Sequence, residues 1–124
     1  MAQQRSVLLV DDSKFARLLV KAFISSNFTD WEIDEAEDAS KALEMVEGKS
    51  YDYLLLDFNM PGMNGLELGE QLRGRFPDSV IALLTANIQQ EIQKKAANLG
   101  LEFLAKPPTE EKMRDFILAQ EASR

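Results

Sequence analysis

The segment YLLLDFNMPGMNG, residues 53–65, joins an apolar run to an acidic residue and a turn. Residues 53–56 are apolar, Asp57 follows them directly, and a proline and two glycines come after it. A continuous apolar run of this length is typical of a strand buried on both faces of a parallel sheet. The segment therefore predicts a buried strand with a carboxylate at its carboxyl end.

Two further apolar runs also end in charged residues. Residues 7–10 lead into Asp11 and Asp12, and residues 101–105 lead into Lys106. Residues 32–36 and 80–85 are also strand-like. In an open α/β sheet, ligands bind outside the carboxyl ends of the strands. We therefore expect one edge of the sheet to gather the polar groups at these strand ends, which are Asp11, Asp12, Asp57, Thr85 and Lys106.

Helical patterns separate the strand-like stretches. Within residues 15–23, an apolar stripe recurs at helical spacing and is expected to face the core. Shorter stripes fall within residues 39–48, 65–74, 88–99 and 109–117. This alternation predicts an α/β fold with a doubly wound five-stranded parallel sheet flanked by five helices. The members of the first stripe are Phe15, Leu18, Leu19, Ala22 and Phe23.

The expected helices carry recognisable end signals. Ser13 and Thr109 precede helical stripes and are good N-caps. Gly48 and Gly100 follow stripes and are expected to stop the second and fourth helices. A chain of 124 residues suits one domain, so we expect residues 1–124 to fold as a single unit.

The composition excludes several classes of function. The chain has no cysteine and no histidine, which rules out thiolate chemistry, imidazole metal ligands and Ser-His-Asp triads. A net charge of −7 argues against direct nucleic-acid binding. No apolar stretch is long enough for membrane insertion, and the first residues leave no room for a secretory signal, so we expect a cytoplasmic location.

Carboxylates gathered at one edge raise each other's pKa unless a positive charge intervenes. A hard divalent ion such as Mg²⁺, which prefers oxygen ligands, is the natural counter-charge. Lys106 would supply the second positive group. An Asp-Asp pair after a strand is by itself a common turn, but the conjunction of three charged strand ends indicates a site.

With these motifs in place, the chain resembles the receiver domain of two-component response regulators from about residue 5 to residue 124. The resemblance implies a flavodoxin-like sheet of order 2-1-3-4-5, and a stand-alone regulator of the chemotaxis type. The matching segments are Val10-Asp11-Asp12-Ser13, residues 56–65, Leu84-Thr85-Ala86 and Ala105-Lys106-Pro107.

The resemblance also implies roles for the site residues. Asp57 would be the phosphoryl acceptor, a carboxylate nucleophile. Asp12 and Asp57 would ligate Mg²⁺ directly, Asp11 largely through water, and Asn59 through its backbone carbonyl. Phosphoryl oxygens would be bound by Lys106, aimed inward by a cis bond to Pro107, and by the Thr85 hydroxyl and the Ala86 N–H.

The output side follows from the same resemblance. Thr85 and Phe103 match the family's switch pair, although Phe103 could also be an ordinary buried strand residue. The expected downstream target would bind the face made by the fourth helix, fifth strand and fifth helix, with Ile88, Gln89, Gln90, Gln93 and Phe103 as contacts. The implied partners are a sensor histidine kinase or phosphotransfer protein, and a phosphatase as a further partner.

Alternatives remain at this point. The chain could be a phosphorelay intermediate, a fragment of a larger regulator, or a Mg²⁺-dependent phosphohydrolase. Such hydrolases need an acid two residues after the nucleophile, where Asn59 stands, so we expect no enzyme activity beyond self-phosphorylation and autodephosphorylation. Two positions depart from the family pattern. Pro108 stiffens the start of the fifth helix. The neutral side chain of Asn87 does not indicate how long the phosphoryl group would last.

Overall fold

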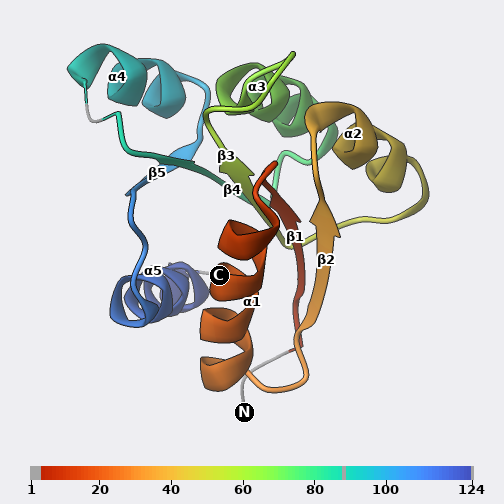
Figure 1. Cartoon of the computed structure of the whole chain (residues 1–124), viewed down its shortest axis with the longest axis vertical. Helices are drawn as coiled ribbons and strands as arrows, with labels where there is room; N and C mark the ends of the chain where they lie inside the picture. The colour runs from red at the N-terminus through yellow and green to blue at the C-terminus, as the bar shows by residue number, and fades with distance from the viewer. Residues whose placement is uncertain (1–3, 88, 124) are drawn as a thin grey trace.

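The structure is a computed structural model that describes residues 4–87 and 89–123, in which strands and helices alternate along the chain (Figure 1). The strands are β1 (Ser6–Val10), β2 (Glu32–Ala36), β3 (Tyr53–Asp57), β4 (Val80–Thr85) and β5 (Glu102–Ala105). The helices are α1 (Lys14–Asn27), α2 (Ala39–Gly48), α3 (Gly65–Arg75), α4 (Gln90–Asn98) and α5 (Glu110–Ser123).

The five strands form one parallel sheet in the order β2-β1-β3-β4-β5, which confirms the predicted fold class and strand order. Helices α1 and α5 cover one face, and α2, α3 and α4 cover the other (Figure 1). Because the sheet is parallel, every strand ends at the same edge. That edge carries Asp57, Thr85 and the residues that follow β1 and β5.

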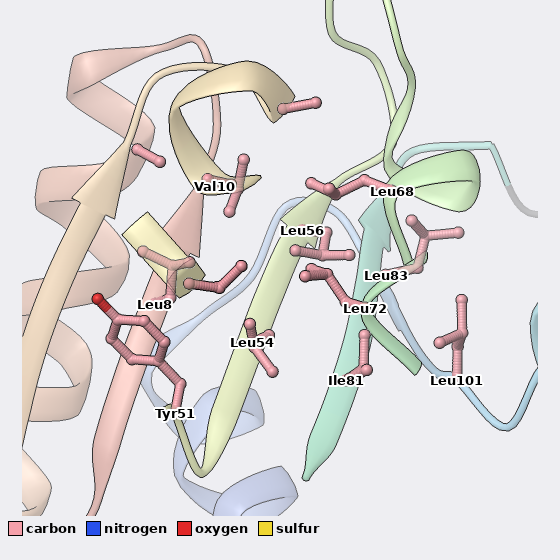
Figure 2. Packing of buried hydrophobic residues seen from close by; sticks show 14 of the residues in the cluster. Leu8, Val10, Tyr51, Leu54, Leu56, Leu68, Leu72, Ile81, Leu83 and Leu101 are labelled. Atoms are coloured by element: carbon pink, nitrogen blue, oxygen red, sulfur yellow. The ribbon is translucent and has the colours of Figure 1, made fainter. Parts of the chain in front are cut away.

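The central strands are buried on both faces, as their uninterrupted apolar sequences predict. Figure 2 shows one of the two cores, where Leu54 and Leu56 of β3 pack with Leu68 and Leu72 of α3. Alternate residues of the same strand enter the other core. There Leu55 lies with Ile24 of α1 and with Met113 and Ile117 of α5. The strand that carries Asp57 is therefore fixed from both sides.

The prediction for α1 was wrong about which face is buried. Phe15 is 75% exposed, and Leu18, Leu19 and Ala22 are exposed as well, whereas Val20 and Ile24 are buried. The helix carries two overlapping apolar stripes, and α1 turns the stripe containing Val20 and Ile24 toward the sheet. Periodicity alone cannot choose between two such stripes.

Most predicted helix ends are confirmed. The side chains of Ser13 and Thr109 accept hydrogen bonds from Ala16 N–H and Lys112 N–H. Gly100 ends the turn after α4 with a φ of 75°, where glycine is favoured. Gly48 was predicted to follow α2, but it is the last residue of that helix, and the extended Lys49 is the C-cap. In the described part of the chain, no helix combines the length and apolarity that crossing a bilayer requires.

Candidate functional site

Asp57 is the last residue of β3, and it is buried with 5% of its surface exposed. The chain then turns back, and α3 begins so close that a Cβ on Gly65 would lie 2.3 Å from the Asp57 carbonyl oxygen and 2.8 Å from Leu83 Cδ1. Only glycine permits this approach. The turn therefore holds Asp57 tightly at the sheet edge.

Lys106 follows β5 and contacts this carboxylate. Its Nζ donates to Asp57 Oδ1 at 2.7 Å and lies 3.5 Å from Asp11 Oδ2. The Lys106–Pro107 peptide is cis, as the resemblance implies. One ammonium group thus bridges carboxylates that come from two different strand ends.

Asp11 and Asp12 follow β1, with Asp11 half-buried and Asp12 exposed. Each of Asp11, Asp12 and Asp57 offers a carboxylate oxygen, and these oxygens lie within 4.8 Å of one another. Asp11 Oδ1 also accepts a hydrogen bond from Ser13 N–H at 2.9 Å. The predicted acidic group is therefore assembled from two strand ends.

Burial raises the pKa of Asp57 above its ordinary value, and the negative charge of Asp11 raises it further. Hydrogen bonds from Lys106 and from the Asn59 backbone N–H oppose this increase without cancelling it. For Lys106, burial lowers the pKa, but the hydrogen bond to Asp57 and the charge of Asp11 outweigh burial, and the pKa is raised. Lys106 is thus held charged, whereas the surroundings of Asp57 favour the protonated carboxyl group more than water does.

Thr85 and Ala86 lie at the end of β4, beside this group. The Thr85 carbonyl accepts a hydrogen bond from Lys106 N–H. The Thr85 side chain is fully buried, and its Oγ1 accepts from Asn87 N–H at 2.9 Å. Ala86 is exposed and lines a groove of about 350 Å³, together with Asp11, Phe15, Lys106 and Pro108. The small Ala86 side chain leaves the site open on this side.

Besides Thr85, the structure describes Phe103, Gln89, Gln90 and Gln93 among the expected output residues. Phe103 on β5 is half-buried and belongs to neither core cluster, so it is not a fully buried strand residue. Gln89, Gln90 and Gln93 are exposed at the start of α4. Ile88 lies outside the described residues. Surface position alone assigns none of them a role.

Sequence reasoning missed Arg17, which contacts the acidic loop, and Glu35, which contacts Arg17. Arg17 Nη1 donates to the Asp11 carbonyl oxygen at 2.6 Å, and Arg17 Nε donates to Glu35 Oε1 at 2.9 Å. Arg17 lies within a helical pattern six residues after Asp11, where a basic residue is unremarkable. The contact depends on how α1 packs beside β2, which the sequence pattern does not specify.

Comparison with known proteins identifies the family. Residues 7–118 match the family model of the response regulator receiver domain. This chain belongs to the receiver family. Receivers are signalling modules of two-component systems, and this one has the sheet order and the acidic edge that the resemblance implied.

Two relatives match this receiver over most of both chains. Chemotaxis protein CheY of Halobacterium salinarum is 34% identical over 119 residues, which cover 94% of the receiver and 95% of the relative. Chemotaxis protein CheY of Pseudomonas aeruginosa is 30% identical over 115 residues, which cover 90% of the receiver and 91% of the relative. The receiver is thus similar in extent to these chemotaxis proteins.

Other relatives are much longer. Sensor protein EvgS of Escherichia coli K12 is 37% identical over 110 residues, but these are only 9% of its length. The receiver spans 34% of a protein-glutamate methylesterase/protein-glutamine glutaminase of Pyrococcus horikoshii, at 34% identity. The same module therefore occurs within larger proteins.

Solved structures agree on the fold. Chemotaxis protein CheY4 of Vibrio cholerae superimposes with a TM-score of 0.86 at 26% identity, covering 94% of the receiver and 98% of that chain. A CheY-like receiver of Methanospirillum hungatei superimposes with a TM-score of 0.88 at 22% identity, covering 98% of this receiver and 96% of that chain. The second likeness is evidence of the fold alone.

Proposed function

We propose that residues 1–124 act as one receiver domain that accepts a phosphoryl group on Asp57 in a Mg²⁺-dependent reaction. The observation that carries this proposal is a buried Asp57 carboxylate, paired with Lys106 at 2.7 Å and grouped with two further carboxylates. A structural ion pair needs one carboxylate for one lysine. The two additional carboxylates suit a divalent cation.

The residues present fit Mg²⁺. Three carboxylates face one lysine, and the pKa of Asp57 is raised by burial and by the negative charge of Asp11. Oxygen ligands are those that Mg²⁺ prefers. Asp12 and Asp57 would hold it directly, Asp11 largely through water, and Asn59 through its backbone carbonyl. Bound there, Mg²⁺ supplies positive charge that neutralises the oxygens of the transferring phosphoryl group.

The transfer itself requires an ionised Asp57. One carboxylate oxygen forms a bond to phosphorus while the bond from phosphorus to the donor's nitrogen breaks, and its electron pair stays on that nitrogen. Lys106 then pairs with a phosphoryl oxygen, and the Thr85 hydroxyl and Ala86 N–H bind another. From its family, the donor is a sensor histidine kinase or a histidine phosphotransfer protein. The phosphohistidine belongs to that partner, because this chain has no histidine.

The output is a change of binding surface. Thr85 Oγ1 now accepts from Asn87 N–H, and a phosphoryl group on Asp57 would draw the hydroxyl toward itself. The segment after β4 would then rearrange and alter the face made by α4, β5 and α5, including Phe103. A target in chemotaxis or motility is supported by the two CheY relatives of matching length. We place the protein in the cytoplasm, where a phosphatase can end the signal.

Intact-mass measurement tests the proposal. The protein is incubated with Mg²⁺ and acetyl phosphate, and the Asp57→Asn variant and a sample with EDTA serve as controls. We expect one added phosphoryl group in the wild type and none in either control. Repeated turnover of varied phosphoesters without a modified protein would instead indicate a phosphohydrolase, and unchanged mass under all conditions would refute the phosphoryl acceptor.

A further inference from the structure

We propose that Arg17, oriented by Glu35, is a positioning residue that fixes the peptide between Asp11 and Asp12 and so prepares the acidic group for its cation. This inference rests on the proposed Mg²⁺ site. It concerns how strongly the chain holds the cation, and it assigns Arg17 no contact with the cation or with the phosphoryl group.

The first step is the contact between Arg17 and the backbone. Arg17 Nη1 donates to the carbonyl oxygen of Asp11 at 2.6 Å. That carbonyl belongs to the peptide bond that joins Asp11 to Asp12. Because a peptide group is planar, fixing its oxygen also fixes the direction of the Asp12 N–H and Cα. One hydrogen bond therefore constrains the spacing of two carboxylates.

The second step is the support that β2 gives to Arg17. Arg17 Nε donates to Glu35 Oε1 at 2.9 Å, and Glu35 lies on β2. The next residue on that strand, Ala36, accepts a hydrogen bond from Asp11 N–H at 3.1 Å. The contacts close a ring from Asp11 through Ala36, Glu35 and Arg17 back to Asp11. Both peptide groups of Asp11 are thereby tied to the same strand.

The third step is the difference between this arginine and its neighbour Lys21. The Arg17 side chain is only 13% exposed and binds two acceptors through two different nitrogens. Lys21 is 44% exposed and lies 3.7 Å from the other oxygen of Glu35. A planar guanidinium can hold two acceptors in a fixed relation, which a single ammonium group cannot do. Lys21 thus offers a matched control of equal charge near the same carboxylate.

Positioning and simple electrostatics predict opposite effects when Arg17 is replaced. Removing a positive charge close to three carboxylates makes the site more negative, which alone would tighten binding of Mg²⁺. Loss of a positioning contact would weaken it. The sign of the change in the dissociation constant therefore separates the two accounts.

The experiment is a Mg²⁺ titration of the full chain followed by amide NMR, which reports binding without any phosphoryl transfer. The variants are Arg17→Gln, Arg17→Lys and the control Lys21→Gln, with thermal unfolding recorded for each. We expect Kd for Mg²⁺ to rise about tenfold in both Arg17 variants, the lower end of what outer contacts of a metal site contribute. In Lys21→Gln it should stay equal or fall.

Arg17→Lys keeps the charge, so a weaker site in this variant is a geometric effect. It also serves as the main test if Arg17→Gln does not fold. In a Glu35→Gln background the same lysine substitution should raise Kd by a smaller factor, because the guanidinium is no longer oriented.

The two proposals fail in different ways. If Arg17→Lys and Arg17→Gln bind Mg²⁺ as tightly as the wild type or more tightly, the contacts of Arg17 do not position the acidic group and the inference is overturned. If the wild type itself shows no saturable shift of amides around Asp12 and Asp57, the proposed Mg²⁺ site fails, and the inference fails with it.

Discussion

Lys106 reaches across a strand to hold Asp57. Asp57 ends β3 and Lys106 follows β5, and β4 lies between these strands in the sheet. The Lys106 Nζ nevertheless donates to Asp57 Oδ1 at 2.7 Å. This contact offsets part of the increase in the pKa of Asp57 that burial causes. The lysine therefore favours the ionised carboxylate of Asp57, and in the proposed phosphoryl transfer it would also meet an incoming phosphoryl oxygen.

Replacing Lys106 by methionine should shift the pH dependence of phosphorylation. Without the ammonium group, the pKa of Asp57 rises further, so the acid limb of the rate profile moves to higher pH. The rate at neutral pH should also fall at least about tenfold, because a donor to the transferring group is lost. The initial rate with acetyl phosphate, measured by intact mass from pH 5 to pH 9, checks both effects, with exposed Lys41→Met as the control. If the acid limb of the variant stayed at the same pH as in the wild type, Lys106 would have no influence on the pKa of Asp57.

Asp57→Asn should stabilise the protein at neutral pH when Mg²⁺ is absent. Burial and the charge of Asp11 raise the pKa of Asp57 in the folded state above the ordinary value of 3.8. The folded state therefore binds the Asp57 proton more tightly than the unfolded state does. The contribution of this proton to the free energy of unfolding is present below pH 3.8 and is lost as pH rises through the folded pKa. We expect the variant to gain about 1 kcal/mol at pH 7, or about 4 °C in Tm. The gain should shrink toward pH 4 and with added Mg²⁺, and a gain independent of pH would contradict this account.

Two glycines of α3 should respond to alanine in opposite ways. A Cβ at Gly65 would lie 2.3 Å from the Asp57 carbonyl oxygen, so Gly65→Ala forces β3 and α3 apart. We expect a loss of about 2 kcal/mol, together with slower phosphorylation. At Gly74 a Cβ meets no atom within 4 Å, and alanine there should add about 0.5 kcal/mol through helix propensity. Urea unfolding measures the change in the free energy of unfolding for each variant. Equal changes at Gly65 and Gly74 would mean that α3 does not approach Asp57 as described.

Arg73 should matter for stability far more than Arg75. Arg73 donates to the carbonyl oxygens of Phe76, Ser79 and Gly100, and so ties the end of α3 to the turn before β5. It also donates to a fourth carbonyl, that of Pro77. Arg73→Met removes all of these donors, and we expect a cost of about 2 kcal/mol. Arg75 is more exposed, so Arg75→Met should cost less than half as much. Thermal unfolding of the two variants measures both losses of stability. Equal losses would mean that the hydrogen bonds of Arg73 to the four carbonyl oxygens contribute no more than the contacts of Arg75.

The sequence predicted the fold well because its strands carry strong local patterns. Glu32–Ala36 and Val80–Thr85 were predicted to the residue. The placing of Asp57 beside Lys106 follows from topology: in a parallel sheet, strand ends share an edge whatever their separation in sequence. The close approach that makes Gly65 necessary is different, since only the packed structure reveals it.

What the sequence could not predict depends on how elements pack against each other. The ring of Arg17, Glu35 and Asp11 needs the register of β1 on β2 and the rotation of α1. That rotation was itself predicted wrongly, because Phe23 belongs to both apolar stripes of the helix. Where two stripes overlap, the choice is made by packing against the sheet and α5, and local periodicity carries no information about it.

The rotation of α1 gives a direct test by paired substitutions. Phe15 is the larger side chain, yet it is 75% exposed, while Ile24 is fully buried against the sheet. Phe15→Ala should therefore change the free energy of unfolding by no more than about 0.5 kcal/mol. Ile24→Ala leaves a cavity and should cost about 3 kcal/mol. Urea unfolding with a shared m-value measures both changes. A large loss at Phe15 with a small one at Ile24 would mean that the helix presents its other stripe to the core, and the contact of Arg17 with Asp11 would then be lost as well.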